Sequence, residues 1–118
     1  MITYADAGSI RFNGVATDMD IMIVIPTLMT DHHDATSLRA AEEYDCGKRS
    51  VRRGTVTYYR DRGTTVVDVD RPPMIRPFFI VEEGSAESRA LTYACSRSGG
   101  VRVADPFEDA YARFAGNS

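Results

Sequence analysis

Two adjacent histidines are the residues best suited to chemistry in this chain. His32 and His33 lie in the stretch TDHHDATS, flanked by Asp31 and Asp34. Imidazole and carboxylate groups are both common metal ligands, so a small metal-binding or hydrolytic protein using His32 and His33 is one alternative. Adjacent residues rarely point the same way, however, and the sequence offers no evident third ligand. We therefore expect a solvated polar loop, with no metal and no cofactor.

Motifs for other kinds of catalysis do not occur. The sequence has no glycine-rich phosphate loop, no nucleophile elbow and no Ser-His-Asp spacing. Ser85, in EEGSAES, precedes a helix-like segment and is better explained as its N-cap than as a nucleophile. We expect that the protein is not an enzyme.

The chain has two cysteines, Cys46 and Cys95. No further cysteine or histidine stands at zinc-ligand spacing around them, and neither has a nearby histidine that could activate it. Two interpretations remain open from the residues alone. The cysteines are either buried free thiols of a cytosolic regulatory domain or a disulfide of an exported protein.

Basic residues are concentrated in one segment. Six of them lie between Lys48 and Arg62 against one acid, although the net charge of the chain is -3. Strand alternation divides these residues between two faces, which favours arginines paired with nearby aspartates over a nucleic-acid stripe. We expect no nucleic-acid partner. The candidate contact for a protein partner is the basic strand and hairpin around Arg52, Arg60 and Arg62.

Length and composition indicate a single globular domain. The chain has 118 residues, of which 43% are apolar and 26% are charged. No apolar run approaches the roughly 20 residues of a membrane helix, so we expect no transmembrane segment. The amino-terminal stretch lacks the basic start and apolar core of a signal peptide.

The first half of the chain predicts antiparallel strands. Asn13-Gly14 suits the positive φ angles of a type I′ hairpin turn, and the second arm alternates apolar residues up to Pro26. Pro26 should end this strand or mark an edge. We expect a loop over residues 27–37 and strands over about 40–46 and 49–59, with a bend or bulge at Gly47 and perhaps Gly54.

The second half predicts two helices after the last strands. RDRG forms a turn, TTVVDVD a strand, and FFIV a short strand or a plug, whereas the prolines of RPPMIRP exclude a central strand. One helix follows Ser85, and another begins with Asp105 as N-cap and Pro106 in its first turn. The order of elements predicts an α+β fold: a curved antiparallel sheet of about six strands packed by one helix, plus an amphipathic C-terminal helix.

Three motifs, in order, resemble the surface-adhesin protein E domain of bacterial cell envelopes. They are YADAGSIRFNG, EYDCGKRSVRRGTVTYYRDRG and PFFIVEEGSAESRALTYAC. The matching positions are Tyr4, Asp6, Ser9, Ile10, Tyr44, Asp45, Cys46, Arg49, Tyr59, Pro77, Gly84, Ser85, Ala94 and Cys95. The resemblance covers residues 2–95, which leads us to divide the chain into a domain, 1–95, and a linker with a helical tail, 96–118.

The resemblance implies several properties that the residues alone do not. It implies a bent antiparallel sheet packed by a helix, a Cys46–Cys95 disulfide, and export to the periplasm, the cell envelope or the outside. It also implies a non-enzymatic module that binds another macromolecule, with self-association into a homodimer as one form of partnership. The chain departs from the family pattern in having no tryptophan.

Overall fold

A computed structural model describes residues 1–74 and 76–116 and has an α+β fold. Ile75 of the proline-rich segment and residues 117–118 of the tail lie outside the described residues. The strands of the sheet are β1 Ile2–Ala5, β2 Arg11–Phe12, β3 Thr17–Met29, β4 Ala35–Asp45, β5 Ser50–Arg60, β6 Thr65–Asp70 and β7 Phe79–Ile80. Two 3-10 turns and two α-helices complete the fold: η1 Ala7–Ser9, η2 Thr30–His32, α1 Ala86–Ser96 and α2 Pro106–Gly116.

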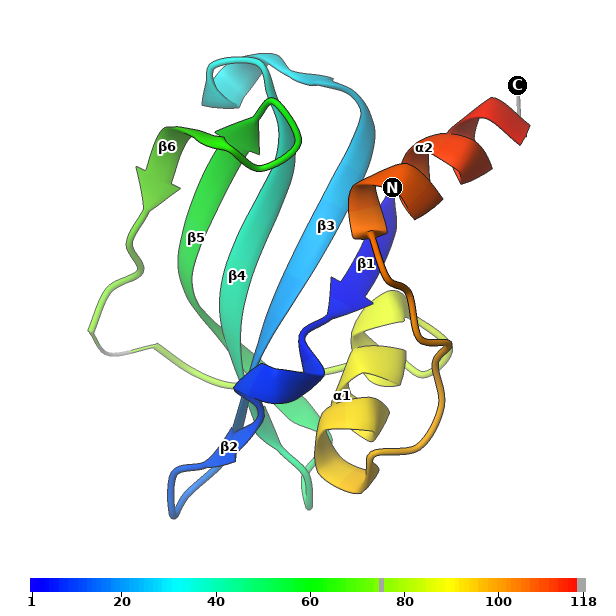
Figure 1. The fold of residues 1–118 in the computed structure, drawn as a ribbon. Helices are drawn as coiled ribbons and strands as arrows, with labels where there is room; N and C mark the ends of the chain where they lie inside the picture. Colours follow the sequence, from blue (N-terminus) through cyan, green and yellow to red (C-terminus); the bar gives the residue numbers. More distant parts are fainter. Residues whose placement is uncertain (75, 117–118) are drawn as a thin grey trace.

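The predicted antiparallel sheet with two helices is confirmed, with seven strands in place of about six in the described chain (Figure 1). The strand order is β1-β3-β4-β5-β6, while β2 pairs with β3 and β7 pairs with β5. All of these pairs are antiparallel. The strand that the sequence analysis did not predict is β1. The two-residue strands β2 and β7 lie within the predicted segments SIRF and FFIV.

The predicted hairpin after SIRF is present, but its turn lies one residue later than expected. The backbone N–H of Asn13 donates to the carbonyl oxygen of Ala16, so Gly14 and Val15 are the central residues. Gly14 has a φ of 93°, and neither Asn13 nor Val15 has a positive φ. Asn13 instead accepts hydrogen bonds from the backbone N–H groups of Val15 and Ala16 through its side chain.

Pro26 does not end β3 as one alternative had it, although it lies beyond the last β1 pair, Ile2–Val24, as an edge position does. The strand runs through Pro26 to Met29, and its pairing with β4 shifts register between Val24 and Met29. This irregular stretch accommodates the missing N–H of proline inside a strand. The loop is correspondingly shorter than residues 27–37, because β3 and β4 take up both of its ends.

The predictions for the chain from Gly47 to the segment FFIV agree better with the structure. The strand β5 shifts register against β4 near Gly54, between the pairs Ala40–Val56 and Glu42–Arg53, as expected for a bulge. The segment FFIV contributes β7, whose two residues are exposed, and the buried Val81. Gly47 lies in the turn between β4 and β5.

The hydrophobic core lies between one face of the sheet and α1. Met19, Ile21 and Ile23 alternate along β3 on this face and are buried with Leu91 of α1. Helix α1 begins at the predicted cap, where the Ser85 side chain accepts the backbone N–H of Ser88. The core face of the sheet is therefore closed by one helix.

A disulfide joins α1 to the sheet. Cys46, in the turn between β4 and β5, is bonded to Cys95 near the end of α1, with the two Cα atoms 5.8 Å apart. This pairing, which only the family resemblance implied, is confirmed. The two cysteines are therefore bonded to each other and are not free thiols.

Helix α2 packs against the face of the sheet opposite to α1. The Tyr4 hydroxyl of β1 donates to Asp109 of α2 at 2.7 Å, and Ala110 is fully buried. Tyr4 shares its face with Met22 across the β1–β3 pair, whereas the core residues Ile21 and Ile23 point the other way. As predicted, α2 begins at Asp105, whose side chain accepts two backbone N–H groups of the first turn.

Candidate functional site

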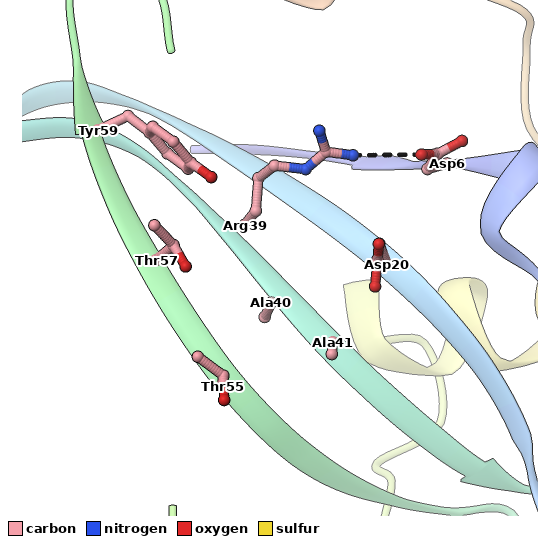
Figure 2. A pocket seen from close by; sticks show the side chains of 8 residues that line it. All are labelled: Asp6, Asp20, Arg39, Ala40, Ala41, Thr55, Thr57 and Tyr59. Atoms are coloured by element: carbon pink, nitrogen blue, oxygen red, sulfur yellow. Dashed lines mark hydrogen bonds and ion pairs between the residues drawn. The ribbon is translucent and has the colours of Figure 1, made fainter. Parts of the chain in front are cut away.

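The face of the sheet that carries α2 also contains an open hollow of about 550 Å³. Strands β3, β4 and β5 form its floor, and the end of β1 forms one side (Figure 2). Its lining residues are Asp6, Asp20, Arg39, Ala40, Ala41, Thr55, Thr57 and Tyr59. We call this hollow the sheet groove.

Small side chains make the sheet groove hollow. Ala41, Thr55 and Thr57 cover the floor, while the long side chains of Arg39 and Tyr59 rise beside them (Figure 2). Arg39 and Thr57 are directly opposite each other in the β4–β5 ladder, so their side chains share one face. A pleated sheet with short side chains between long ones leaves a depression that can receive part of a ligand.

One ion pair organises the polar side of the groove. The Arg39 guanidinium donates to Asp6 at 3.2 Å, and both side chains are almost half exposed. An exposed pair of this kind adds little stability, typically below about 1 kcal/mol. The pair instead holds a partly solvated guanidinium at the rim of the groove.

The remaining polar groups of the groove have no partner within the described residues. The Asp20 carboxylate and the hydroxyl groups of Thr55, Thr57 and Tyr59 form no hydrogen bond or ion pair with another described residue. They can therefore bind to an external molecule without first breaking an internal contact. The groove thus presents two carboxylates, a guanidinium and three hydroxyl groups to solvent.

Helix α2 covers another part of the same face. Burial and the hydrogen bond to Asp109 raise the pKa of Tyr4 to about 12. The same hydrogen bond, together with Arg113, lowers the pKa of Asp109. The phenol therefore stays protonated, and the contact between β1 and α2 persists at neutral pH.

The three arginines predicted from the sequence do not lie together. Arg52 donates to Glu43 at 2.9 Å, and its guanidinium carbon lies 4.4 Å from the ring centroid of Phe78. Arg60 ends the same strand, eight positions further on, which corresponds to about 26 Å along a strand. Arg52 is thus separated from the other two and has partners inside the protein.

Arg60 and Arg62 lie at the turn between β5 and β6, and both have internal contacts. Arg60 donates to the carbonyl oxygen of His33 at 2.9 Å. The guanidinium carbon of Arg62 lies 5.0 Å from the ring centroid of Tyr111 in α2. These two arginines form a basic turn that connects the η2 loop and α2 to the sheet.

The two histidines are in different surroundings. His32 Nδ1 lies 2.9 Å from Asp68 Oδ2, and the His32 ring stacks on Tyr58 with 3.8 Å between centroids. His33 has a φ of 55° and does not belong to this group. The sequence analysis found no third ligand near the histidines because Asp68 lies 36 positions away. Only the pairing of β6 with β5 brings it there.

A second hollow, of about 480 Å³, opens at the start of β5 and contains a buried carboxylate. Glu42 is 2% exposed, and it accepts hydrogen bonds from Tyr44 and from Arg53. Burial raises the pKa of Glu42 despite the nearby Arg53. Because both carboxylate oxygens are used internally, this hollow offers an external molecule fewer free polar groups than the sheet groove.

The sequence contained a partial signal for the sheet groove. Alternation puts Arg39 and Ala41 on one face of β4, and Thr55, Thr57 and Tyr59 on one face of β5. Neither set has unusual residue types, so neither stands out before the strands are paired. The depression exists only because the register places the small residues side by side.

Comparison with known families identifies one match. The family described as Surface-adhesin protein E matches residues 1–96. This range includes every lining residue of the sheet groove and both cysteines, and it ends before α2. Searches of curated proteins and of solved structures found no match. None of the described helices has the length and apolar character needed to span a membrane.

Proposed function

Because the chain belongs to the surface-adhesin protein E family, we propose that it is an exported bacterial protein of the periplasm, cell envelope or exterior. Its role is to bind another macromolecule, and it is not an enzyme. The family description supports a surface adhesin-type protein, and the Cys46–Cys95 disulfide is consistent with an oxidising compartment.

The sheet groove is the proposed contact surface. The observation that carries this assignment is the set of unpartnered polar groups on an open sheet face, with Asp20, Thr57 and Tyr59 among them. Groups that already have internal partners contribute less to binding, because those contacts must first be broken. This distinction favours the groove over Arg52, Arg60 and Arg62, which we retain as a second, weaker contact.

The partner is proposed to be a protein. The groove is polar and contains both an acid and a base, as the rims of protein interfaces commonly do. Self-association into a homodimer is the alternative within this proposal. Sedimentation equilibrium of the purified, disulfide-bonded protein distinguishes a dimer from a monomer that binds a different protein.

The test compares a substitution inside the groove with a matched one outside it. Thr55→Arg fills the groove from an exposed strand position, and Thr27→Arg adds the same side chain at an exposed position of β3 outside it. Because the family description is that of a surface adhesin, the probe is a panel of extracellular-matrix proteins, whose binding to the immobilised, disulfide-bonded protein is measured by biolayer interferometry. We expect Thr55→Arg to weaken binding at least tenfold and Thr27→Arg to leave it unchanged.

Two other results would contradict the proposal at different points. If Arg62→Ser abolishes binding and Thr55→Arg does not, the basic turn is the contact and the groove assignment is wrong. If no panel protein binds and the native protein is recovered from the cytoplasmic fraction with both cysteines reduced, the exported binding module is wrong.

A further inference from the structure

On the sheet face opposite to the groove, three metal-ligand side chains converge from two distant segments. His32 comes from η2, and Asp68 and Asp70 come from β6, where positions two apart share one face. His32 Nδ1 lies 2.9 Å from Asp68 Oδ2 and 4.0 Å from Asp70 Oδ2. One ligand atom from each residue lies within 4.8 Å of the others.

The imidazole is held in this orientation by contacts outside the three residues. Its ring is nearly parallel to that of Tyr58, with 7° between the planes. The side chain of Arg60 anchors the same loop by donating to the carbonyl oxygen of His33. Because a ligand held in place loses little freedom on binding, this packing lowers the entropic cost of adding an ion.

The spacing of the three atoms fits one coordination sphere. Zinc bonded at about 2.1 Å to tetrahedral ligands places these ligands about 3.4 Å apart. The separations of 2.9 and 4.0 Å from His32 Nδ1 lie on either side of this value, and all three ligand atoms lie within 4.8 Å of one another. The Asp70 side chain is 56% exposed, so it is free to make the small rotation that equal bond lengths require.

The charge of the cluster also favours a cation. Asp68 and Asp70 stand on the same face of β6, and in the described chain no lysine or arginine lies within 4.0 Å of either carboxylate. Their close partners are His32 and the Tyr58 hydroxyl, which donates to Asp70 at 3.1 Å. Two carboxylates that converge on one imidazole leave negative charge that a divalent ion would neutralise.

We propose that His32, Asp68 and Asp70 bind a divalent transition-metal ion, of which zinc is the representative. Imidazole nitrogen favours zinc, cobalt or nickel over calcium and magnesium, and the two carboxylates complete a nitrogen–oxygen ligand set. Three protein ligands leave coordination positions for water or for a side chain of a partner. The site does not include His33, and it is separate from the sheet groove.

Isothermal titration calorimetry with ZnCl₂ tests the site on the tag-free, disulfide-bonded protein after EDTA treatment and dialysis. We expect one zinc per chain. His32→Gln and Asp70→Asn should each weaken zinc binding at least about tenfold. Substituting residues that only hydrogen-bond to a metal ligand already lowers metal affinity by that much. His33→Gln is the matched control, because it removes the adjacent imidazole from outside the cluster, and it should retain wild-type affinity. CaCl₂ should give no heat at the same concentrations.

A second measurement keeps the test valid if His32→Gln disturbs the loop. Asp70→Asn conserves shape at a half-exposed position, and its melting curve without metal should match that of the wild type. Zinc should raise the melting temperature of wild type and His33→Gln but not of Asp70→Asn. Equal zinc affinity in wild type and Asp70→Asn, equal losses in both histidine variants, or no binding at millimolar zinc would overturn the site. None of these results bears on the sheet groove.

Discussion

Glu42 and Glu43 are neighbours in β4 that point to opposite faces of the sheet, and each is bonded to a different arginine of β5. Glu42 accepts from Arg53 on the core face, and Glu43 accepts from Arg52 on the other face. Burial raises the pKa of Glu42, whereas the hydrogen bond from Arg52 lowers the pKa of Glu43. Within the basic segment, Arg52 and Arg53 are thus paired with acids, and these acids are glutamates and not the expected aspartates.

These opposite pKa shifts predict opposite pH dependences of stability. The native state binds the proton of Glu42 more tightly than the unfolded chain does, so this residue's contribution to stability falls as pH rises from 4.5 through the raised pKa. Relative to Glu42→Gln, the wild type should therefore lose unfolding free energy as pH rises through that range. Urea denaturation at several pH values measures the difference.

Glu43→Gln is the matched control for that experiment. Because the pKa of Glu43 is lowered in the native state, this residue stabilises the fold fully above pH 4.5, the ordinary pKa of glutamate. That stabilisation is lost as the pH falls through the lowered pKa. Relative to Glu43→Gln, the wild type should lose unfolding free energy as the solution is acidified. If the difference in unfolding free energy between wild type and variant changed with pH in the same direction for both variants, the two carboxylates would not occupy these different surroundings.

The disulfide should supply much of the stability of this small domain. Cys46 and Cys95 are 49 positions apart, and closing a loop of that length stabilises by about 4 kcal/mol in the chain-entropy model. We expect Cys46→Ala/Cys95→Ala to lower the free energy of unfolding by about that amount in guanidinium denaturation. Treating the double variant with reductant serves as the control and should change nothing. An undiminished stability in the double variant would mean that the crosslink does not restrain the unfolded chain.

The contact between Tyr4 and Asp109 can be followed through tyrosine ionisation. The difference in ultraviolet absorbance between wild type and Tyr4→Phe reports ionisation of the Tyr4 phenol. Its midpoint should lie near pH 12, well above the ordinary tyrosine pKa of 10.0. Deleting α2 from residue 105 onwards should bring the midpoint down, because burial and the Asp109 partner are both lost. A midpoint already near 10.0 in the wild type would place α2 away from β1 in solution.

Gly63 joins the β5–β6 turn to α2 by close approach. It has a φ of 79°, and a Cβ atom at this position would lie 2.9 Å from Phe107. Gly63→Ala should therefore destabilise the protein by more than 1 kcal/mol and reduce the hydrogen-exchange protection of α2. Gly14→Ala is the control, since Gly14 also has a positive φ but no atom within 4 Å of the added Cβ. Equal effects of the two substitutions would show that backbone strain alone, without the Phe107 contact, accounts for the loss.

Local features of the fold could be predicted well. The helix starts at Ser85 and Asp105 could be predicted because each side chain caps the first turn of its own helix. The bulge near Gly54 could be predicted because glycine inside a strand pattern often marks one. The end of β3 was predicted less well. The tolerance of β3 for Pro26 depends on a break in pairing with β4, which nearby residues do not encode.

The sequence by itself determined the elements of this protein except β1, because alternation and capping depend on residues a few positions apart. It also carried the family motifs through which Cys46 was paired with Cys95. Only the tertiary structure decided which distant groups share a site: Asp20 and Thr55 both line the sheet groove, and His32 meets Asp68 beside Tyr58. The physical reason is that strand pairing and register decide which side chains gather on one face of the sheet, and no local pattern specifies that register.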